Sequence, residues 1–144
     1  MEVTAGVLHD AYRALADIIN RPRQIPQMAK YRIAKLHSAL QPFYEPIEAR
    51  RAEIIERIGE EVFEDEAKTK SAGWGVKPGS PQFEEYLAEW NRLRAETVTL
   101  PSLMLIDLGM LGNEVRGIEA HEFKALEPFI HESVPTEGNA SQGA

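Results

Sequence analysis

The longest amphipathic pattern in the chain runs from Pro26 to Gly59. Apolar residues recur there mostly at steps of three and four, the spacing that keeps one side of a helix apolar. These residues are Ala29, Ile33, Leu36, Leu40, Phe43, Ile47, Ile54 and Ile58. The pattern predicts one long helix against which the other elements pack, with Pro26 in its first turn, where a missing N–H costs nothing.

Two prolines, Pro42 and Pro46, fall inside this predicted helix. A proline in a helix interior removes a backbone hydrogen bond and clashes with the carbonyl four residues earlier, so two helices with a break near Gln41 are an alternative. However, the apolar spacing keeps its phase across both prolines, and both project away from the apolar side. We therefore predict a single kinked helix that is convex on the side of the prolines.

Three shorter helices are predicted around the long one. The first has Thr4 as its N-cap and ends at Asn20-Arg21-Pro22. The next has Ser80 as its N-cap and Pro81 as its first residue, and should pack against Ile47 to Ile58 as a helical hairpin. The last covers Ile118 to Ile130, with Ala120, Phe123, Leu126, Phe129 and Ile130 on the inner side and Glu119, Glu122 and Lys124 outside. The inner residues of the first two are Val7, Leu8, Ala11, Leu15, Ile18 and Ile19, and Phe83, Tyr86, Leu87, Trp90 and Leu93.

Strand signals are short. Lys68 to Ser80 is rich in glycine and proline, which predicts a loop or a hairpin in which Trp74 and Val76 lie beside Val62 and Phe63. Thr97 to Leu100 has β-propensity, and Ser102 to Met110 favours an extended run. The fold class predicted is mainly α, a helical hairpin or bundle around one long kinked helix with a minor β-hairpin. Residues 1–132 would form a single domain and residues 133–144 a flexible tail.

Composition narrows the classes of protein. The chain has 144 residues and no cysteine, which excludes disulfides and thiolate metal sites. No apolar run is long enough for a membrane span, and Met1 to Thr4 show no basic region followed by an apolar block, so we expect neither membrane insertion nor secretion.

Charge is unevenly distributed along the chain. The net charge is −7, yet Ile18 to Tyr44 contains five basic residues and no acid, so the rest carries −12. The basic residues are Arg21, Arg23, Lys30, Arg32 and Lys35, and the densest acidic block is Glu60, Glu61, Glu64, Asp65 and Glu66. This polarity indicates either self-association or a charged partner, or else neutralisation of one region by the other within the fold.

No set of residues forms a recognisable catalytic or metal motif. His121, Glu122 and His131 lack the four-residue helical spacing of zinc ligands, so we expect them on the surface. We expect His9 and His37 in solvent, and Asp107 at a turn or strand edge. The glycines at 73 and 75 and at 109 and 112 match no phosphate-binding loop. We therefore predict no enzyme and no cofactor.

Two features remain as candidate contact sites. The basic residues at 21, 23, 30, 32 and 35, with Tyr31 among them, could touch phosphates, but the acidic net charge favours a solvated or internally paired surface, and we do not expect nucleic acid to bind. Trp74 lies in a turn-rich segment, where it either contacts a protein partner or caps the hairpin.

The order of segments resembles a family of small bacteriophage proteins of uncharacterised function. The resemblance covers the chain up to Ile130 and is carried by Tyr31 to Leu36, Arg51 to Gly59, Phe83 to Tyr86, Thr97 to Leu100 and Leu126 to Ile130. It brings no catalytic residue. It implies a virion or morphogenesis component, in the particle or the cytoplasm of the infected host, that works by contact with itself or another protein. Alternatives are a host-directed accessory or inhibitor protein and a nucleic-acid-binding module.

Overall fold

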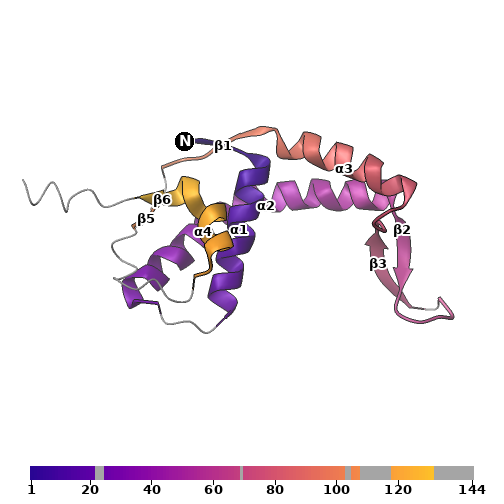
Figure 1. The fold of residues 1–144 in the computed structure, drawn as a ribbon, viewed down its shortest axis with the longest axis horizontal. Coiled ribbons are helices and arrows are strands. Elements are labelled where there is room, and N and C mark those ends of the chain that lie inside the picture. Colours follow the sequence, from indigo (N-terminus) through magenta and orange to yellow (C-terminus); the bar gives the residue numbers. More distant parts are fainter. Residues whose placement is uncertain (22–24, 69, 103–104, 108–117, 132–144) are drawn as a thin grey trace, which may run out of the picture. The chain divides into compact units, whose positions relative to one another are not determined.

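The computed structural model describes residues 1–21, 25–68, 70–102, 105–107 and 118–131, and it is mainly helical, as predicted (Figure 1). The helices are α1 (Ala5–Asn20), α2 (Gln27–Ile58), α3 (Pro81–Arg94) and α4 (Ala120–Leu126), with the 3-10 helix η2 (Glu127–Phe129) following α4. The strands are β1 (Glu2–Thr4), β2 (Glu60–Phe63), β3 (Ser71–Gly75), β4 (Thr97–Thr99), β5 (Ile106–Asp107) and β6 (Ile130–His131).

The chain forms two compact units. The first consists of Met1, Asp10–Pro42 and the described residues from Thr99 onward, and the second consists of Glu2–His9 and Phe43–Val98. Residues 108–117 and 132–144, which include the predicted tail over 133–144, lie outside the described residues.

Helix α1 begins where the sequence predicts. The Thr4 hydroxyl oxygen accepts a hydrogen bond from the backbone N–H of Val7 at 3.2 Å, which satisfies one of the donors left free at a helix start. Leu8, Leu15 and Ile18 are buried as predicted, whereas Ile19 is exposed. The apolar side of α1 is therefore narrower than the spacing indicates.

Helix α2 is a single helix from Gln27 to Ile58 and continues through Pro42 and Pro46. The prediction of one helix is confirmed, and a break near Gln41 is wrong. Both prolines are exposed, while the predicted apolar side is buried at six of its eight positions. These positions are Ala29, Ile33, Leu36, Leu40, Ile47 and Ile58. Burial of this stripe supplies the stability that the helix loses at the prolines.

The start of α2 differs by one residue from the prediction. Pro26 precedes the helix, and its carbonyl oxygen accepts the bond from the Lys30 N–H at 3.0 Å. Proline therefore occupies the capping position rather than the first turn. Its fixed φ still restricts the chain as it enters the helix.

In the second unit, α3 packs along the second half of α2 as a helical hairpin, and β2 and β3 form the connection (Figure 1). The Nε of Arg51 on α2 donates to the hydroxyl of Tyr86 on α3 at 3.0 Å. Ion pairs Arg50–Glu96 and Arg57–Glu89 also link the two segments. Tyr86 and Leu93 are buried as predicted, but Leu87 is exposed.

Two further small sheets were only partly predictable. Strand β4 confirms the signal at Thr97 to Leu100, but its partner β1 was not predicted. In the first unit, β5 pairs in parallel with β6, and Ile106 lies opposite Ile130. This pairing places Asp107 at a strand edge.

The last helix is shorter than predicted. It ends at Leu126, and Glu127–Phe129 continue it only as a 3-10 turn that contains Pro128. A proline cannot supply the N–H that an α-helix requires at that point. The helix therefore ends in a 3-10 turn, and the strand β6 follows it. Leu126 and Phe129 are buried as predicted, whereas Ala120 is exposed.

Candidate functional site

The β2–β3 hairpin of the second unit confirms the predicted pairing. Its register places Glu60 opposite Gly75, Glu61 opposite Trp74 and Val62 opposite Gly73. A glycine is required at the base, because a Cβ on Gly59 would lie 2.4 Å from the Gly75 carbonyl oxygen. Gly73 has a φ of 106°, which favours glycine.

The hairpin presents an exposed aromatic residue. The Trp74 side chain is 47% exposed, and Glu61, directly opposite in the register, shares its face of the hairpin. Val62 is 45% exposed and lies on the other face. Of the two alternatives for Trp74, the structure favours a surface position over a buried cap. Its contact with a protein remains a prediction.

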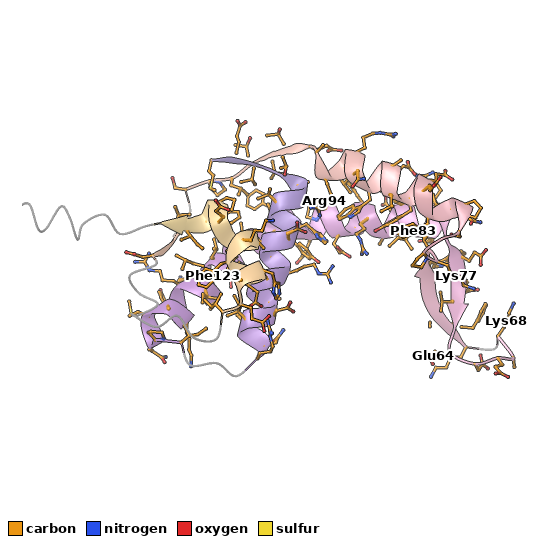
Figure 2. All side chains as sticks on the ribbon, viewed as in Figure 1. Glu64, Lys68, Lys77, Phe83, Arg94 and Phe123 are labelled. Atoms are coloured by element: carbon orange, nitrogen blue, oxygen red, sulfur yellow. The ribbon has the colours of Figure 1, made fainter. Side chains whose placement is uncertain are left out.

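Acidic residues are concentrated on the hairpin that carries this aromatic side chain. The block Glu60, Glu61, Glu64, Asp65 and Glu66 begins in β2 and continues to the tip, where Figure 2 shows Glu64 and Lys68, while Lys77 lies nearer the base. Lys70 pairs with Glu64 at 3.0 Å. Glu61 has no ion-pair partner within the described part of the chain. The face that carries Trp74 therefore also carries a carboxylate that no described cation neutralises.

A buried polar cluster holds the helices of this unit together. His9 is only 3% exposed, and its Nε2 donates to Glu48 Oε2 at 2.8 Å. The expectation that His9 lies in solvent is therefore wrong. Its ring stacks on Tyr44 at 5.1 Å between centroids and meets the edge of Trp90 at 5.0 Å. The imidazole of His9 in α1 can be buried because its Nε2–H is hydrogen-bonded to the Glu48 carboxylate in α2.

Glu48 is the shared acceptor of this cluster. Its carboxylate accepts from His9, from the Tyr44 hydroxyl at 3.3 Å and from Arg51 Nη1 at 2.9 Å. Burial alone would raise the pKa of Glu48, but the His9 hydrogen bond and the Arg51 charge outweigh burial and lower it. A carboxylate held ionised by three donors is suited to fixing helices rather than to taking up a proton.

Two arginines near the Trp90 ring complete the cluster. The guanidinium carbons of Arg51 and Arg94 lie 5.5 Å and 5.6 Å from the Trp90 ring. Arg94 also packs against α1, where a Cβ on Gly6 would lie 2.9 Å from its guanidinium (Figure 2). The cluster thus anchors the start of α1 and fixes the α2–α3 pair from which the hairpin projects.

The predicted basic residues do not form one continuous site. Arg21 is bound by Glu122 and by Glu119, the latter at 3.5 Å. Arg32 donates to the Leu105 carbonyl at 3.4 Å, and the Lys35 ammonium lies 5.7 Å from the Tyr31 ring centroid. Arg23 lies outside the described residues. Lys30 is exposed and, among the residues that the structure describes, has no ion-pair partner.

Glu122 corrects the prediction for the last helix. It was expected on the outer side but is only 1% exposed. One carboxylate oxygen accepts from the Glu119 backbone N–H at 2.9 Å and the other from Arg21. Local spacing could not reveal this, because the arginine that neutralises Glu122 is 101 residues away in sequence.

The remaining histidines are not gathered into a metal site. His121 is exposed, as expected, and its nearest acid is Glu119 at 3.4 Å. No group of three or more potential metal ligands occurs among the described residues. His37 is half-buried rather than solvated and stacks on Tyr12 at 4.3 Å. Burial lowers the pKa of His37.

The first unit contains a groove between the end of α1 and the start of α2. It has a volume of about 410 Å³. The lining residues are Ile18, Ile19, Asn20, Arg21, Ile25, Lys30, Ile33 and Ala34. Its lining is therefore largely apolar, with two cationic side chains, and one of these, Arg21, is already paired.

Comparison with known proteins does not add to this description. No helix in the described part of the chain has the length and hydropathy of a membrane span. No protein-family model, curated protein or solved structure matches the chain. The candidate site is therefore defined by the surfaces themselves, the hairpin with Trp74 and the groove beside Lys30.

Proposed function

We propose that this protein acts without catalysis, through protein–protein contact made by the β2–β3 hairpin, as a component of a bacteriophage particle or of its assembly. The observation that carries the proposal is the exposed Trp74 on a two-stranded sheet, beside Glu61, which no cation pairs with in the described part of the chain. Tryptophan is among the residues that contribute most to protein interfaces when it is buried by a partner.

The geometry of the hairpin supports this use. Within the described residues, β2 and β3 pair only with each other, so each offers a free edge for main-chain hydrogen bonds. The hairpin follows α2 directly at Gly59, which lies so close to the Gly75 carbonyl that the paired backbone is constrained before a partner arrives. Such preorganisation reduces the entropy lost on binding.

The bacteriophage role rests on the resemblance in segment order, and the same surface would serve a host-directed accessory protein. The two roles differ in the identity of the partner. A virion or morphogenesis component should be present in purified particles or in assembly intermediates, whereas an accessory protein should retain a specific host protein.

The test compares the wild-type chain with Trp74→Ala during particle assembly. The matched control is Leu87→Ala, which removes another exposed apolar side chain from the same unit. We expect the wild-type chain and the Leu87 variant to sediment with particles or intermediates, and the Trp74 variant to be reduced roughly tenfold or more. Circular dichroism would check that all three chains fold.

Two results would contradict the proposal. Absence of the wild-type chain from particles and intermediates would remove the structural role, and a host protein retained by wild type but not by Trp74→Ala would replace it with the accessory role. Undiminished incorporation of Trp74→Ala would show that the hairpin face is not the contact surface.

A further inference from the structure

We infer that the hairpin docks into the groove between α1 and α2 of a second copy of this chain. The inference rests on the proposed contact through the hairpin and names its partner. Trp74 would enter the groove, and Glu61 would meet Lys30 at its edge. The two surfaces lie in different units. One carries an exposed aromatic side chain beside an acid, and the other is a largely apolar groove lined in part by a lysine.

The groove can accept an aromatic side chain. Its volume of about 410 Å³ falls within the range of roughly 300 to 1,000 Å³ found for pockets that enclose small ligands. Ile18, Ile25 and Ile33 line it and are buried, while Ile19 at its edge is 45% exposed. An indole placed there would cover Ile19 and remove apolar surface from water on both sides.

The hairpin offers the complementary group. The indole of Trp74 stands on the same face as Glu61, because the two residues are direct cross-strand neighbours. A docking Trp74 therefore brings a carboxylate with it. An indole and a carboxylate on one face would bind best to an apolar site with a free cation at its edge.

Lys30 is that cation. It lines the groove and has no ion-pair partner in the described portion of the chain, while Arg21 is held by Glu119 and Glu122. The stretch from Ile18 to Tyr44 contains no acid that would repel the incoming carboxylate. Glu61 and Lys30 are thus two charges of opposite sign, each without an ion-pair partner among the described residues and each beside exposed apolar surface.

In the proposed arrangement each copy uses its hairpin toward one neighbour and its groove toward another, which makes the contact heterologous. A heterologous contact leaves one free hairpin and one free groove in every dimer, so assembly continues until a ring closes or a filament forms. The mass should therefore rise with concentration, and it should fall as salt screens the exposed charges.

The experiment measures mass in solution by sedimentation velocity and light scattering over a wide concentration range at low salt. We expect wild type to form species larger than a dimer. Trp74→Ala should raise the concentration at which these species form at least tenfold, and Leu87→Ala should behave as wild type.

Charge reversal tests the ion pair. Glu61→Lys and Lys30→Glu should each weaken assembly, and the chain carrying both substitutions should assemble again. All four side chains are exposed, so folding is expected to be retained.

A mixing experiment identifies the head-to-tail geometry. Trp74→Ala retains an intact groove, and Lys30→Glu retains an intact hairpin. An equimolar mixture should form a heterodimer that stops at two chains, because only one competent pair of surfaces is present. A closed dimer in which two copies exchange hairpins would already stop at two chains in wild type, so the size of the wild-type species separates the two arrangements.

Other outcomes would overturn the inference. A wild-type chain that is monomeric at every concentration would exclude docking on a second copy, yet Trp74-dependent incorporation into particles would still support the proposed function with a different partner. An oligomer that is insensitive to Trp74→Ala and to both charge reversals would place self-association on another surface.

Discussion

Among the described residues, the buried polar side chains Glu122 and His9 are each bound by a partner far away in the sequence. Glu122 is bound by Arg21 and by the Glu119 backbone, and His9 is bound by Glu48. Breaking such a pair leaves a buried group without its partner, which costs more than the intact pair contributes. The free energy of unfolding should therefore respond asymmetrically when one or both partners are removed.

Arg21→Met tests this asymmetry in the first unit. It should lower the free energy of unfolding by roughly 2–3 kcal/mol, because the Glu122 carboxylate stays buried without its cation. Arg21→Met combined with Glu122→Met should recover most of the loss. Chemical denaturation of both variants measures the difference. The control is Arg50→Met, which breaks an exposed ion pair and should cost less. A double variant no more stable than Arg21→Met would contradict the explanation.

His37 gives a prediction for pH. Burial lowers its pKa in the folded chain, so the unfolded chain binds a proton more readily as the pH falls below the ordinary value of 6.5. The contribution of His37 to stability is thus complete above that value, and it is lost as the pH falls from there toward the lowered pKa.

Denaturation at pH 7 and at pH 5 tests this prediction. The free energy of unfolding should fall less between the two pH values in His37→Gln than in wild type. Ser38→Ala, a neighbour that does not titrate, should keep the wild-type loss, and equal losses in all three chains would refute the assignment.

Sequence reasoning placed correctly those residues whose hydrogen-bond partners lie nearby in the sequence. Thr4 caps α1 because the N–H that it accepts lies three residues away. His9 and Glu122 were misplaced because their partners lie 39 and 101 residues away, and periodicity carries no signal over such distances. An acid or a histidine without a visible partner is assigned to solvent by default.

At the scale of elements, the base of the hairpin is the most constrained junction. Gly59 follows α2 directly, and its N–H donates to the Ile55 carbonyl at 2.7 Å. The strand β3 then passes so close that Gly59 has no room for a side chain. The helix end and the first strand pair are therefore fixed by a single residue.

Gly59→Ala should disturb this junction. A Cβ would lie 2.4 Å from the Gly75 carbonyl oxygen and 2.6 Å from that of Ile55, both backbone atoms that cannot turn aside. We expect a loss of roughly 1–3 kcal/mol in the free energy of unfolding. Gly75→Ala is the matched control, because its Cβ would meet only the Val62 side chain, at 3.2 Å. Thermal denaturation should separate the two, and a Gly75→Ala loss as large as that of Gly59→Ala would argue against the backbone clash.

Long elements followed from the sequence more completely than short ones. The apolar side of α2 has eight positions that agree in phase, so two prolines could not obscure it. By contrast, β1 has three residues and pairs with a strand more than ninety positions later, and its composition alone does not distinguish it from a disordered start. Leu87 was assigned to the packed side of α3 together with the adjacent Tyr86. The structure buries Tyr86 and leaves Leu87 exposed.

At the scale of the whole molecule, the candidate site was half predicted. Trp74 was identified from its turn-rich segment and the basic residues from their charge. The groove could not be identified from the sequence, because it arises from the packing of α1 on α2. The uneven charge of the chain also proved more local than composition indicates. Arg21 is neutralised within its own unit, whereas Lys30 and Glu61 have no ion-pair partner among the residues that the structure describes.

The continuity of α2 through Pro42 and Pro46 has a consequence for its amide hydrogens. Neither proline has an N–H, so the carbonyls of Ser38 and Pro42 receive no intrahelical bond there, and the division between the two units falls directly after Pro42. Opening that starts at one end of the helix should stop at this gap in the hydrogen-bond ladder. Hydrogen–deuterium exchange read by mass spectrometry should therefore show two blocks of protection in one helix. Arg21→Met should speed exchange between Gln27 and Gln41 and leave the block from Ile47 to Ile58 unchanged.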